Sequence, residues 1–396
     1  MKKNILIIGG VLAIAVAIFG FRFKTSHYKR SITAHLELPI REEVTQRDAT
    51  QNESQIQIAL ILDTSGSMDG LLDQAKSQLW NIINELARAE KDSTQAAISI
   101  ALYEYGNDNI SVRQGYVRQV LPFTADLDLL SEKLFALSTN GGSEYCGKAI
   151  HTSLKELEWS ANDESMKAIY IAGNEPFNQG TFSHQEACQM ASQKGVTVFP
   201  IFCGDMAEGQ RTHWGDCAQL TAGQFMNIDS DVKVVHVATP YDDQINQLNY
   251  QLNNTYIYYG NDGRRMKSNQ LRQDENQAKY SKMNSVSRAL SKSSNIYMNS
   301  NWDLLDAYNA DTTVITSIDK ETLPDSLQEM NTIELKNVVL EKQQEREKIK
   351  NEIAKLGVER ANYIADNNTS ANEVTLGEKM VNTIKIEAKK KGYVFH

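Results

Sequence analysis

The stretch from Ile56 to Leu62 constrains the fold more than any other, because it is almost continuously apolar. Such a strand is typical of a parallel sheet whose two faces are both covered by helices. Apolar residues then recur at helical spacing between Leu72 and Leu86, which predicts an amphipathic helix. Further apolar runs predict strands at 97–105, 116–123, 168–172, 196–202 and 224–228, with helices near 126–137, 147–159 and 184–194. This alternation predicts an α/β fold with a doubly wound, mostly parallel sheet.

The length of 396 residues allows two or three domains, and changes in composition indicate where they divide. We expect a polar linker over 31–55, the sheet domain over 56–240 and a mostly helical C-terminal region over 241–396. Within that last region, a helix should cover 241–259. The stretch near 261–300 is rich in Asn, Ser, Lys and Gln, and we interpret it as a second polar linker.

A highly charged stretch from Leu327 to Ala361 carries apolar residues at helical spacing. Lys342 and Arg346 interrupt its apolar seam, which argues against a sustained coiled coil. We therefore expect a helical hairpin that packs on itself.

The first thirty residues resemble a targeting segment rather than part of a folded domain. Two lysines precede an uncharged apolar stretch, Ile5 to Phe21, which Arg22 and Lys24 follow. This pattern is typical of a signal peptide or signal anchor. No small-residue cleavage pattern follows the apolar core, so we expect residues 1–30 to be retained as a single membrane span. We expect the bulk of the chain outside the cytoplasm, in the periplasm or at the cell surface, although the basic residues after the span leave the orientation open.

The charge balance bears on the partners that the chain can bind. Its formal net charge is -9, whereas phosphate binding requires a clustered basic face. We therefore predict no nucleic-acid partner. The one dense basic run, Lys389 to Lys391, is interpreted as a solvated helix end.

Four cysteines occur, at positions 146, 188, 203 and 217. Their even number is compatible with disulfides in an oxidising compartment, but four cysteines allow three pairings. A pair between Cys203 and Cys217 is the easiest to imagine, because it closes a short loop. Free buried thiols are the alternative that the sequence leaves open.

The segment Asp63-Thr64-Ser65-Gly66-Ser67 follows the first strand and precedes the first helix. One carboxylate and two hydroxyls at alternate positions of a tight loop offer hard oxygen ligands, which suit Mg²⁺, Mn²⁺ or Ca²⁺ and not zinc. The structural alternative is that Ser67 caps the helix that follows. We favour the metal site, because strand, motif and helix come in the order that places ligands at the carboxyl edge of a sheet.

This motif resembles the metal ion-dependent adhesion site of the von Willebrand factor A family, and the resemblance covers roughly residues 55–240. It implies a Rossmann-like fold for that region. It also implies a hydroxyl ligand from a later loop, which Ser143 in Gly141-Gly142-Ser143-Glu144 matches, with Thr139 as a substitute. A further Asp is expected at the end of a strand, in a T-D-G-E-P-like sequence.

The matching stretch here is Ile171-Ala172-Gly173-Asn174-Glu175-Pro176, so Gly173 stands where the family has Asp. Asn174 or Glu175 then has to reach the ion, directly or through water, or the site binds metal more weakly. The metal ligands that the resemblance implies are Asp63, Ser65, Ser67, Ser143, Asn174 and Glu175.

We predict a binding module and not an enzyme. No G-x-S-x-G or H-E-x-x-H sequence occurs, and the P-loop-like run from Gly142 to Ala149 lacks the final Ser or Thr that holds Mg²⁺. Asp205, His213 and Cys217 fit no standard zinc spacing. The resemblance implies a protein ligand that offers a carboxylate to the metal. The open alternatives are a non-catalytic partner subunit of an ATPase or other envelope enzyme, and a structural envelope protein with a vestigial metal site.

Overall fold

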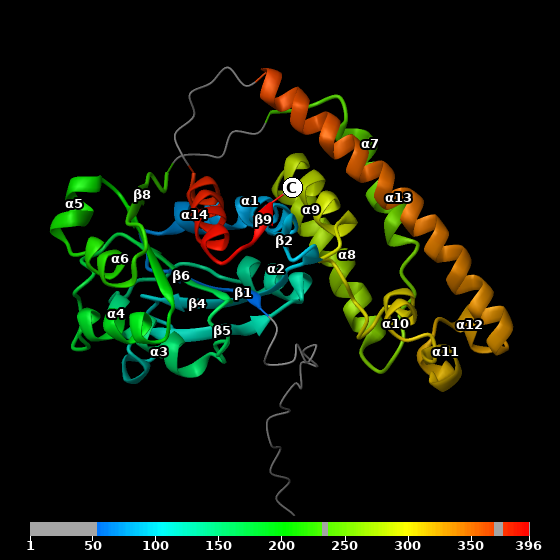
Figure 1. Ribbon diagram of the computed structural model, residues 1–396, viewed down its shortest axis with the longest axis horizontal. Helices are drawn as coiled ribbons and strands as arrows, with labels where there is room; N and C mark the ends of the chain where they lie inside the picture. The colour runs from blue at the N-terminus through cyan, green and yellow to red at the C-terminus, as the bar shows by residue number, and fades with distance from the viewer. Residues whose placement is uncertain (1–53, 232–236, 368–374, 396) are drawn as a thin grey trace, which may run out of the picture. The chain divides into compact units, whose positions relative to one another are not determined.

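A six-stranded sheet organises the chain, as the apolar runs predicted. The computed structural model describes residues 54–231, 237–367 and 375–395, which all belong to one compact unit, Thr45–His396. The strands are β1 (Gln55–Asp63), β4 (Ala97–Tyr105), β5 (Val117–Thr124), β6 (Met166–Gly173), β7 (Thr197–Cys203) and β8 (Met226–Ile228). They lie in the order β5-β4-β1-β6-β7-β8, and only the edge strand β5 is antiparallel to its neighbour (Figure 1). The predicted strands and the mostly parallel sheet are confirmed.

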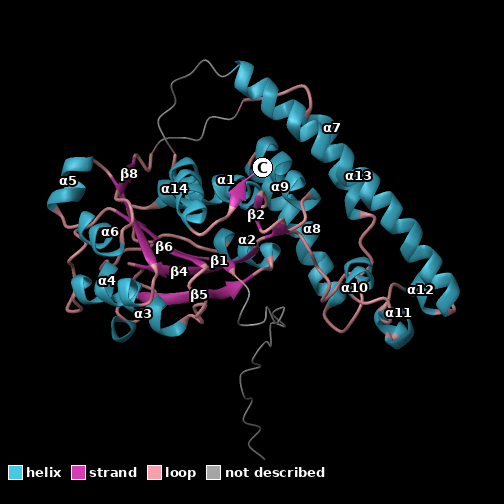
Figure 2. Cartoon of the chain, in the orientation of Figure 1, coloured by secondary structure: helices cyan, strands magenta, loops and turns pink. Residues whose placement is uncertain are grey.

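Helices cover both faces of this sheet (Figure 2). One face packs on α1 (Asp69–Leu86) and α2 (Leu127–Phe135), and the other on α3 (Cys146–Glu156), α4 (His184–Gln193) and α6 (Gly215–Thr221). The short helix α5 (Met206–Arg211) precedes α6. Along β1 successive apolar side chains enter the two cores alternately, which explains why this strand is apolar at almost every position.

The C-terminal end of the chain returns to the sheet domain. Helix α14 (Leu376–Lys390) packs on α1 and β6, where the hydroxyls of Tyr170 and Thr383 are 2.9 Å apart. The backbone N–H of Leu376 donates to the side chain of Gln74 on α1 at 3.0 Å. Strand β9 (Val394–Phe395) then pairs with β2 (Ala89–Lys91), which also pairs with β3 (Thr94–Gln95). The sheet domain therefore includes residues that the sequence assigned to the C-terminal region.

Between β8 and α14 the chain forms a set of helices. They are α7 (Asp242–Asn253), α8 (Gly263–Tyr280), α9 (Lys282–Ser293), α10 (Leu304–Ala310), α11 (Val314–Ser317), α12 (Asp325–Gln328) and α13 (Thr332–Asn367). Two short 3₁₀ turns, η1 (Val112–Gln114) and η2 (Lys320–Thr322), complete the elements of the described residues.

Two expectations for this region were wrong. The stretch near 261–300 is not a linker, because α8 and α9 occupy most of it. The charged stretch from Leu327 to Ala361 is not a hairpin either, since α13 runs as one helix of 36 residues and packs on α7 and α9 (Figure 1). Its buried apolar residues face other helices rather than a second half of the same helix: Ile353 lies in the core that α7 and α9 share, and Leu335 packs with residues of α10 and α11.

A buried polar network explains why the α8 and α9 sequences look like a linker. Arg288 on α9 is fully buried, and its guanidinium donates to Asp128 on α2 at 2.7 Å and to Asp274 on α8. Lys292 donates to the same Asp274 carboxylate at 2.8 Å. Burial alone would raise the pKa of Asp274, but the two cations hold this pKa below its ordinary value. Charged side chains thus pair inside the fold, where a composition-based interpretation places them in solvent.

None of the helices in the described residues is long and apolar enough to cross a membrane. The predicted signal or anchor segment, with its apolar core over 5–21, lies outside the described residues, and so does the expected linker up to residue 53. The membrane span therefore stays a prediction from the sequence.

The return of α14 to the sheet domain predicts different roles for two isoleucines of that helix. Ile384 is 2% exposed, whereas Ile386 is 52% exposed. Ile384→Ala should lower the free energy of unfolding by about 2–5 kcal/mol, because it leaves a cavity beneath the helix. Ile386→Ala, the same chemical change at the surface, should alter it by less than about 0.5 kcal/mol. Chemical denaturation of the full-length chain measures both, and equal effects would contradict the packing of α14 on the sheet domain.

Candidate metal centre

Asp63 is the last residue of β1 and lies beside Tyr105, the last residue of β4. Its side chain is fully buried. The Oδ1 atom accepts a hydrogen bond from the backbone N–H of Ser65 at 2.8 Å, whereas the buried Oδ2 atom has no hydrogen-bond partner. A buried carboxylate oxygen without a donor is costly unless a cation binds it.

The electrostatic surroundings of Asp63 disfavour its charge. The pKa of this carboxyl is raised to about 7, mainly by burial; the nearby Glu144 and Glu175 carboxylates add to the rise, and the hydrogen bonds from Ser65 oppose it. Three acidic side chains thus converge on the end of β1. Such a group is stabilised by a bound cation, which offsets both the burial and the mutual repulsion.

The two serines of the motif lie on the same loop, with their hydroxyl oxygens 3.5 Å apart. Ser65 is buried, and its hydroxyl lies close to both the Asp63 and the Glu144 carboxylates, whose pKa values it lowers. Ser67 is exposed and accepts a hydrogen bond from the side-chain amide of Asn174 at 3.1 Å. The N-cap of α1 is Met68 and has no side-chain hydrogen bond, so Ser67 does not act as the cap that the alternative required.

The loop that carries Ser143 packs against the motif. The backbone N–H of Asn140 donates to the Thr64 carbonyl at 3.0 Å, and a Cβ at Gly142 would come to 1.7 Å from the Gly106 carbonyl oxygen. Glycine is therefore required at position 142, where φ is +129°. Ser143 follows on this loop and is half-buried.

Thr139, the substitute ligand, is engaged elsewhere. Its hydroxyl donates to the carboxylate of Asp69 at the start of α1. Ser143 is therefore the better candidate for the hydroxyl ligand, because its loop packs against the motif and the Thr139 hydroxyl is bonded to Asp69.

The other two predicted ligands lie on the loop after β6. The side-chain Oδ1 atom of Asn174 is buried and has no hydrogen-bond partner, like Asp63 Oδ2. The carboxylate of Glu175 accepts from the side-chain amide of Gln179 at 3.0 Å, and its backbone carbonyl accepts from the indole N–H of Trp214 at 2.8 Å. Asn174 is thus free to reach an ion directly, while Glu175 contributes negative charge nearby.

Sequence reasoning missed Glu144 as a member of this site. Its side chain is 7% exposed, and burial raises the pKa of its carboxyl while the hydrogen bond from Ser65 opposes the rise. The sequence did contain a signal for Glu144. This acidic residue directly follows Ser143, on the loop that the resemblance already predicted to lie beside the Asp63 motif.

The structure also explains why position 173 carries no Asp. A Cβ at Gly173 would come to 2.2 Å from the hydroxyl oxygen of Tyr105 and to 2.9 Å from Asp63 Oδ2. Tyr105 is fully buried, and its hydroxyl donates to the Ala172 carbonyl at 3.1 Å. The tyrosine hydroxyl therefore occupies the space that a side chain at position 173 would need.

The donor set fits a hard divalent cation. Asp63, Ser65, Ser67, Ser143 and Asn174 all offer oxygen, and two of these oxygens are buried without a hydrogen-bond partner. Oxygen ligands suit Mg²⁺, Mn²⁺ or Ca²⁺ better than softer metals. An ion held there would polarise an additional oxygen ligand that approaches from the exposed Ser67 side.

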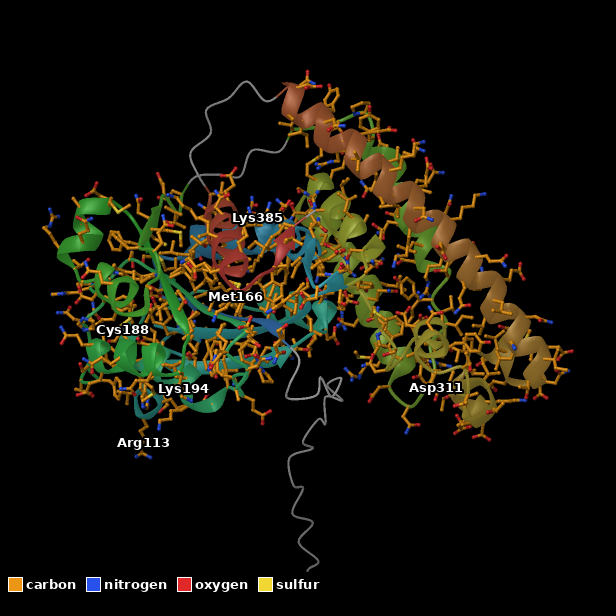
Figure 3. The ribbon with its side chains drawn as sticks, in the orientation of Figure 1. Arg113, Met166, Cys188, Lys194, Asp311 and Lys385 are labelled. Carbon is orange, nitrogen blue, oxygen red and sulfur yellow. A yellow bond between two sulfur atoms is a disulfide. The ribbon has the colours of Figure 1, made fainter. Side chains whose placement is uncertain are left out.

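The expected disulfide between Cys203 and Cys217 was wrong. Cys217 on α6 is bonded to Cys188 on α4, with 5.1 Å between their Cα atoms (Figure 3). Cys203 ends β7 inside the sheet domain and is free and buried, as is Cys146. Helices α4 and α6 pack against each other, which brings together two cysteines that are 29 residues apart in sequence.

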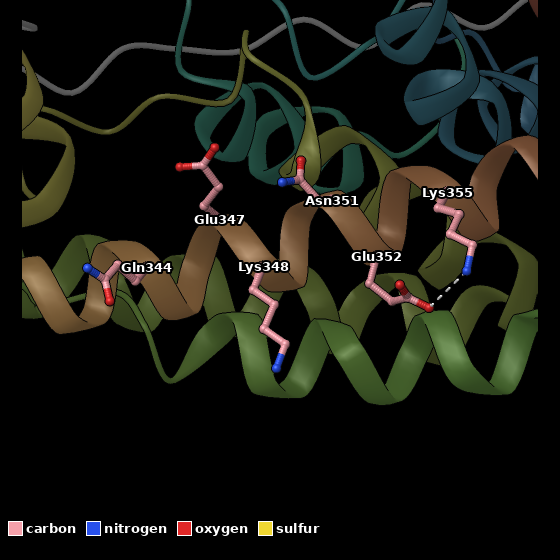
Figure 4. Close-up of a pocket in the computed structure, with 6 residues that line it drawn as sticks. All are labelled: Gln344, Glu347, Lys348, Asn351, Glu352 and Lys355. Atoms are coloured by element: carbon pink, nitrogen blue, oxygen red, sulfur yellow. Dashed lines mark ion pairs between the residues drawn. The ribbon is translucent and has the colours of Figure 1, made fainter.

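A hollow of the surface lies along α13, and none of the motif residues lines it. It has a volume of about 600 Å³ and runs along α13, where Glu352 and Lys355 form an ion pair of 4.0 Å (Figure 4). Its lining residues are Gln344, Glu347, Lys348, Asn351, Glu352 and Lys355. Because all of them come from one helix, the hollow is an open flank of α13 and not an enclosed ligand pocket.

The family model of the von Willebrand factor type A domain matches residues 57–260, just over half of the chain. The chain belongs to this family. The match contains the Asp63 motif, the Ser143 loop and the Asn174 loop, which lie in the part of the chain where von Willebrand factor type A (VWA) domains often carry a metal ion-dependent adhesion site (MIDAS). VWA domains are usually non-catalytic binding modules, and they often bind proteins through this site. A comparison with curated proteins finds no match.

Solved structures with similar folds come from unrelated settings. Proximal thread matrix protein 1 of the mussel byssus is 12% identical over 45% of this chain, with a TM-score of 0.33, and the alignment spans only 42% of that protein. An aerotolerance-related membrane protein from Bacteroides fragilis is 16% identical over 44% of this chain and 93% of its own, with a TM-score of 0.31. The pilus adhesin SpaC of Lactobacillus rhamnosus GG is 12% identical over 46% of this chain and 28% of its own, with a TM-score of 0.33. These likenesses carry no conclusion about function.

The contact between Gly173 and Tyr105 leads to a prediction about restoring the family's Asp. Gly173→Asp should lower the free energy of unfolding by about 1–3 kcal/mol, because the new side chain overlaps the Tyr105 hydroxyl. In a Tyr105→Phe background the same substitution should cost less, since the overlapping oxygen is gone. Thermal unfolding of the four chains of this double-mutant cycle measures the coupling. An identical loss in both backgrounds would show that Tyr105 does not exclude Asp from position 173.

Proposed function

We propose that this chain is a metal-dependent protein-binding module of the adhesion type, and not an enzyme. The observation that carries the proposal is Asp63 Oδ2, which is fully buried and has no hydrogen-bond partner at the carboxyl edge of the central strand. A divalent cation bound to this oxygen offsets the cost of burying the carboxylate. The oxygens of Ser65, Ser67, Ser143 and Asn174 complete its coordination, directly or through water.

Glu144 acts in this proposal as a positioning residue. Its carboxylate lies beside the Ser65 hydroxyl, which lowers the pKa of Glu144, and in this proposal it orients that hydroxyl for the ion. Glu175 is held by Gln179 and sets the negative potential near the ion. Only Asp63 among the direct ligands is charged, so the metal stays electrophilic and attracts a carboxylate from a partner protein. That carboxylate approaches over the exposed Gly66-Ser67 rim.

Presentation outside the cytoplasm is the second part of the proposal. The apolar segment near the N-terminus supports a membrane anchor, and the Cys188–Cys217 disulfide supports an oxidising compartment. We place the domain in the periplasm or at the cell surface, tethered by its N-terminal segment.

Metal binding can be tested without knowing the partner. Calorimetric titration of the full-length chain with Mg²⁺ and with Mn²⁺ should detect one site, and Asp63→Asn should abolish its heat signal because the charged ligand is lost. The matched control is Asp205→Asn, since Asp205 caps α5 by accepting from two backbone N–H groups and lies in another loop. Absence of binding in the unsubstituted chain, or unchanged binding in Asp63→Asn, would refute the metal site.

The compartment can be tested through the cysteines. When cells are quenched with an alkylating agent and the chain is denatured, we expect label on Cys146 and Cys203 alone, detected by peptide mass spectrometry. Cys188→Ser should also lower the free energy of unfolding by about 3–4 kcal/mol on the chain-entropy estimate for this loop. Cys203→Ser is the control that leaves the disulfide intact. Label on all four cysteines in the unsubstituted chain would contradict an exported domain.

A further inference from the structure

Three side chains with metal-binding atoms converge at a place that the MIDAS does not include. The Nε2 atom of His184 is 2.9 Å from Oδ2 of Asp216, and the Nδ1 atom of His213 is 3.2 Å from the same oxygen. The ligand atoms of the three residues all lie within 4.8 Å of one another. This is the one group of three or more His, Cys, Asp or Glu side chains in the described residues that converges in this way.

The backbone holds each member of this cluster in place. His184 is the first residue of α4, and Asp216 lies at the start of α6. His213, between α5 and α6, has a φ of 72°, a left-handed conformation that is uncommon outside glycine. With the backbone in this conformation, the His213 imidazole lies within hydrogen-bonding distance of Asp216.

The disulfide fixes the two helices that carry the cluster. Cys188 lies one turn after His184 on α4, and Cys217 directly follows Asp216 on α6. The covalent bond therefore sets the distance between two of the three side chains. Asp205 and Cys217 are the residues near His213 in sequence that could bind a metal with it. In the fold, however, Asp205 caps α5 and Cys217 forms the disulfide.

We infer that His184, His213 and Asp216 form a second metal site, selective for Zn²⁺ and similar borderline cations. Imidazole nitrogen combined with one carboxylate oxygen is a donor set that zinc prefers, in contrast to the all-oxygen MIDAS. Tetrahedral zinc with bonds of about 2.0–2.1 Å places its ligand atoms about 3.3 Å apart. The separations of 2.9 and 3.2 Å therefore need only a small expansion.

Binding also requires a change of tautomer. Without a metal, each imidazole donates the proton of the nitrogen that faces Asp216, because an ionised carboxylate can only accept. With zinc bound, those nitrogens carry the metal, and each neutral ring carries its proton on the other nitrogen.

The site is open on one side. The His184 side chain is 10% exposed, whereas Asp216 and His213 are 32% and 47% exposed. A surface hollow of about 600 Å³, lined in part by Asp216, Gln219 and Phe225, adjoins the cluster. Three protein ligands with an open approach leave the fourth zinc position to water.

The segment that carries His213 is hydrogen-bonded to the loop after β6, which holds Asn174 and Glu175. The carbonyl of Thr212, next to His213, accepts from the backbone N–H of Phe177 at 2.9 Å. Trp214, on its other side, donates to the Glu175 carbonyl at 2.8 Å. Zinc at His213 thus fixes the segment on which the Asn174–Phe177 loop rests.

The test uses the untagged full-length chain with the MIDAS silenced by Asp63→Asn, so that zinc cannot bind at the oxygen site. After metal removal with EDTA, zinc is titrated in competition with a chromophoric chelator. We expect one zinc ion per chain, and a rise in the unfolding temperature with zinc. Adding His213→Asn should weaken zinc binding by at least about 10-fold, since loss of a ligand costs more than loss of a residue that only supports one. Asparagine tolerates the left-handed backbone, so this variant should still fold.

The control is His151→Asn in the same background. The His151 ring lies against Phe182 at an angle of 40° and is not a member of the cluster, so zinc affinity should not change. If His213→Asn lowers the unfolding temperature before zinc is added, Asp216→Asn supplies the second variant. Failure of the Asp63→Asn chain to bind zinc, or equal affinity with and without the His213 and Asp216 side chains, would overturn the inference. Neither outcome would touch the Mg²⁺ and Mn²⁺ results for the MIDAS.

Discussion

The burial of the Asp63 carboxylate at the end of the central strand is the constraint on which the rest of the site depends. This side chain has no access to water, and only one of its oxygens receives a hydrogen bond from the protein. The surrounding loops approach it closely because glycine stands where any Cβ would collide, at positions 106, 142 and 173. The fold thus uses backbone space to bring oxygen atoms, and not cationic side chains, to a buried negative charge. The divalent cation that we propose would offset this buried negative charge.

The Gly173 departure belongs to the same arrangement and is no isolated loss. The Tyr105 hydroxyl takes the space next to Asp63 and fixes the end of β6 through the Ala172 carbonyl. Acidic character is supplied instead by Glu144 and Glu175, which are near enough to raise the pKa of Asp63. Moving negative charge from a direct ligand to supporting positions keeps the ion electrophilic while the site stays acidic. In the proposed function, the site binds metal with a different distribution of carboxylates.

The sequence predicted those features that depend on neighbouring residues, and it missed those that depend on contacts between residues far apart in the chain. The strands and the Asp63 motif were predictable, because apolar periodicity and ligand spacing act over a few residues. The Cys188–Cys217 bond was not, since it depends on how α4 and α6 pack. The helices α8 and α9 were missed for a related reason: Arg288 and Lys292 look like solvent-exposed residues until Asp128 and Asp274 are placed beside them. Each of these errors therefore concerns a pair of residues that are distant in sequence and that only the fold brings together.

Helix α1 connects the metal site to the C-terminal helices. It begins two residues after Ser67, and it packs against both α9 and α14. Its Asn84 amide donates to the Ser287 carbonyl on α9 at 3.0 Å, and Gln74 accepts from the first residue of α14. Interiors as closely packed as this one do not deform continuously, so a shift of α1 that accompanies a change at the MIDAS has to be accommodated by both helices. Helix α1 thus joins the Asp63 motif directly to α9 and α14, a connection that a separate C-terminal domain on a flexible linker would not make.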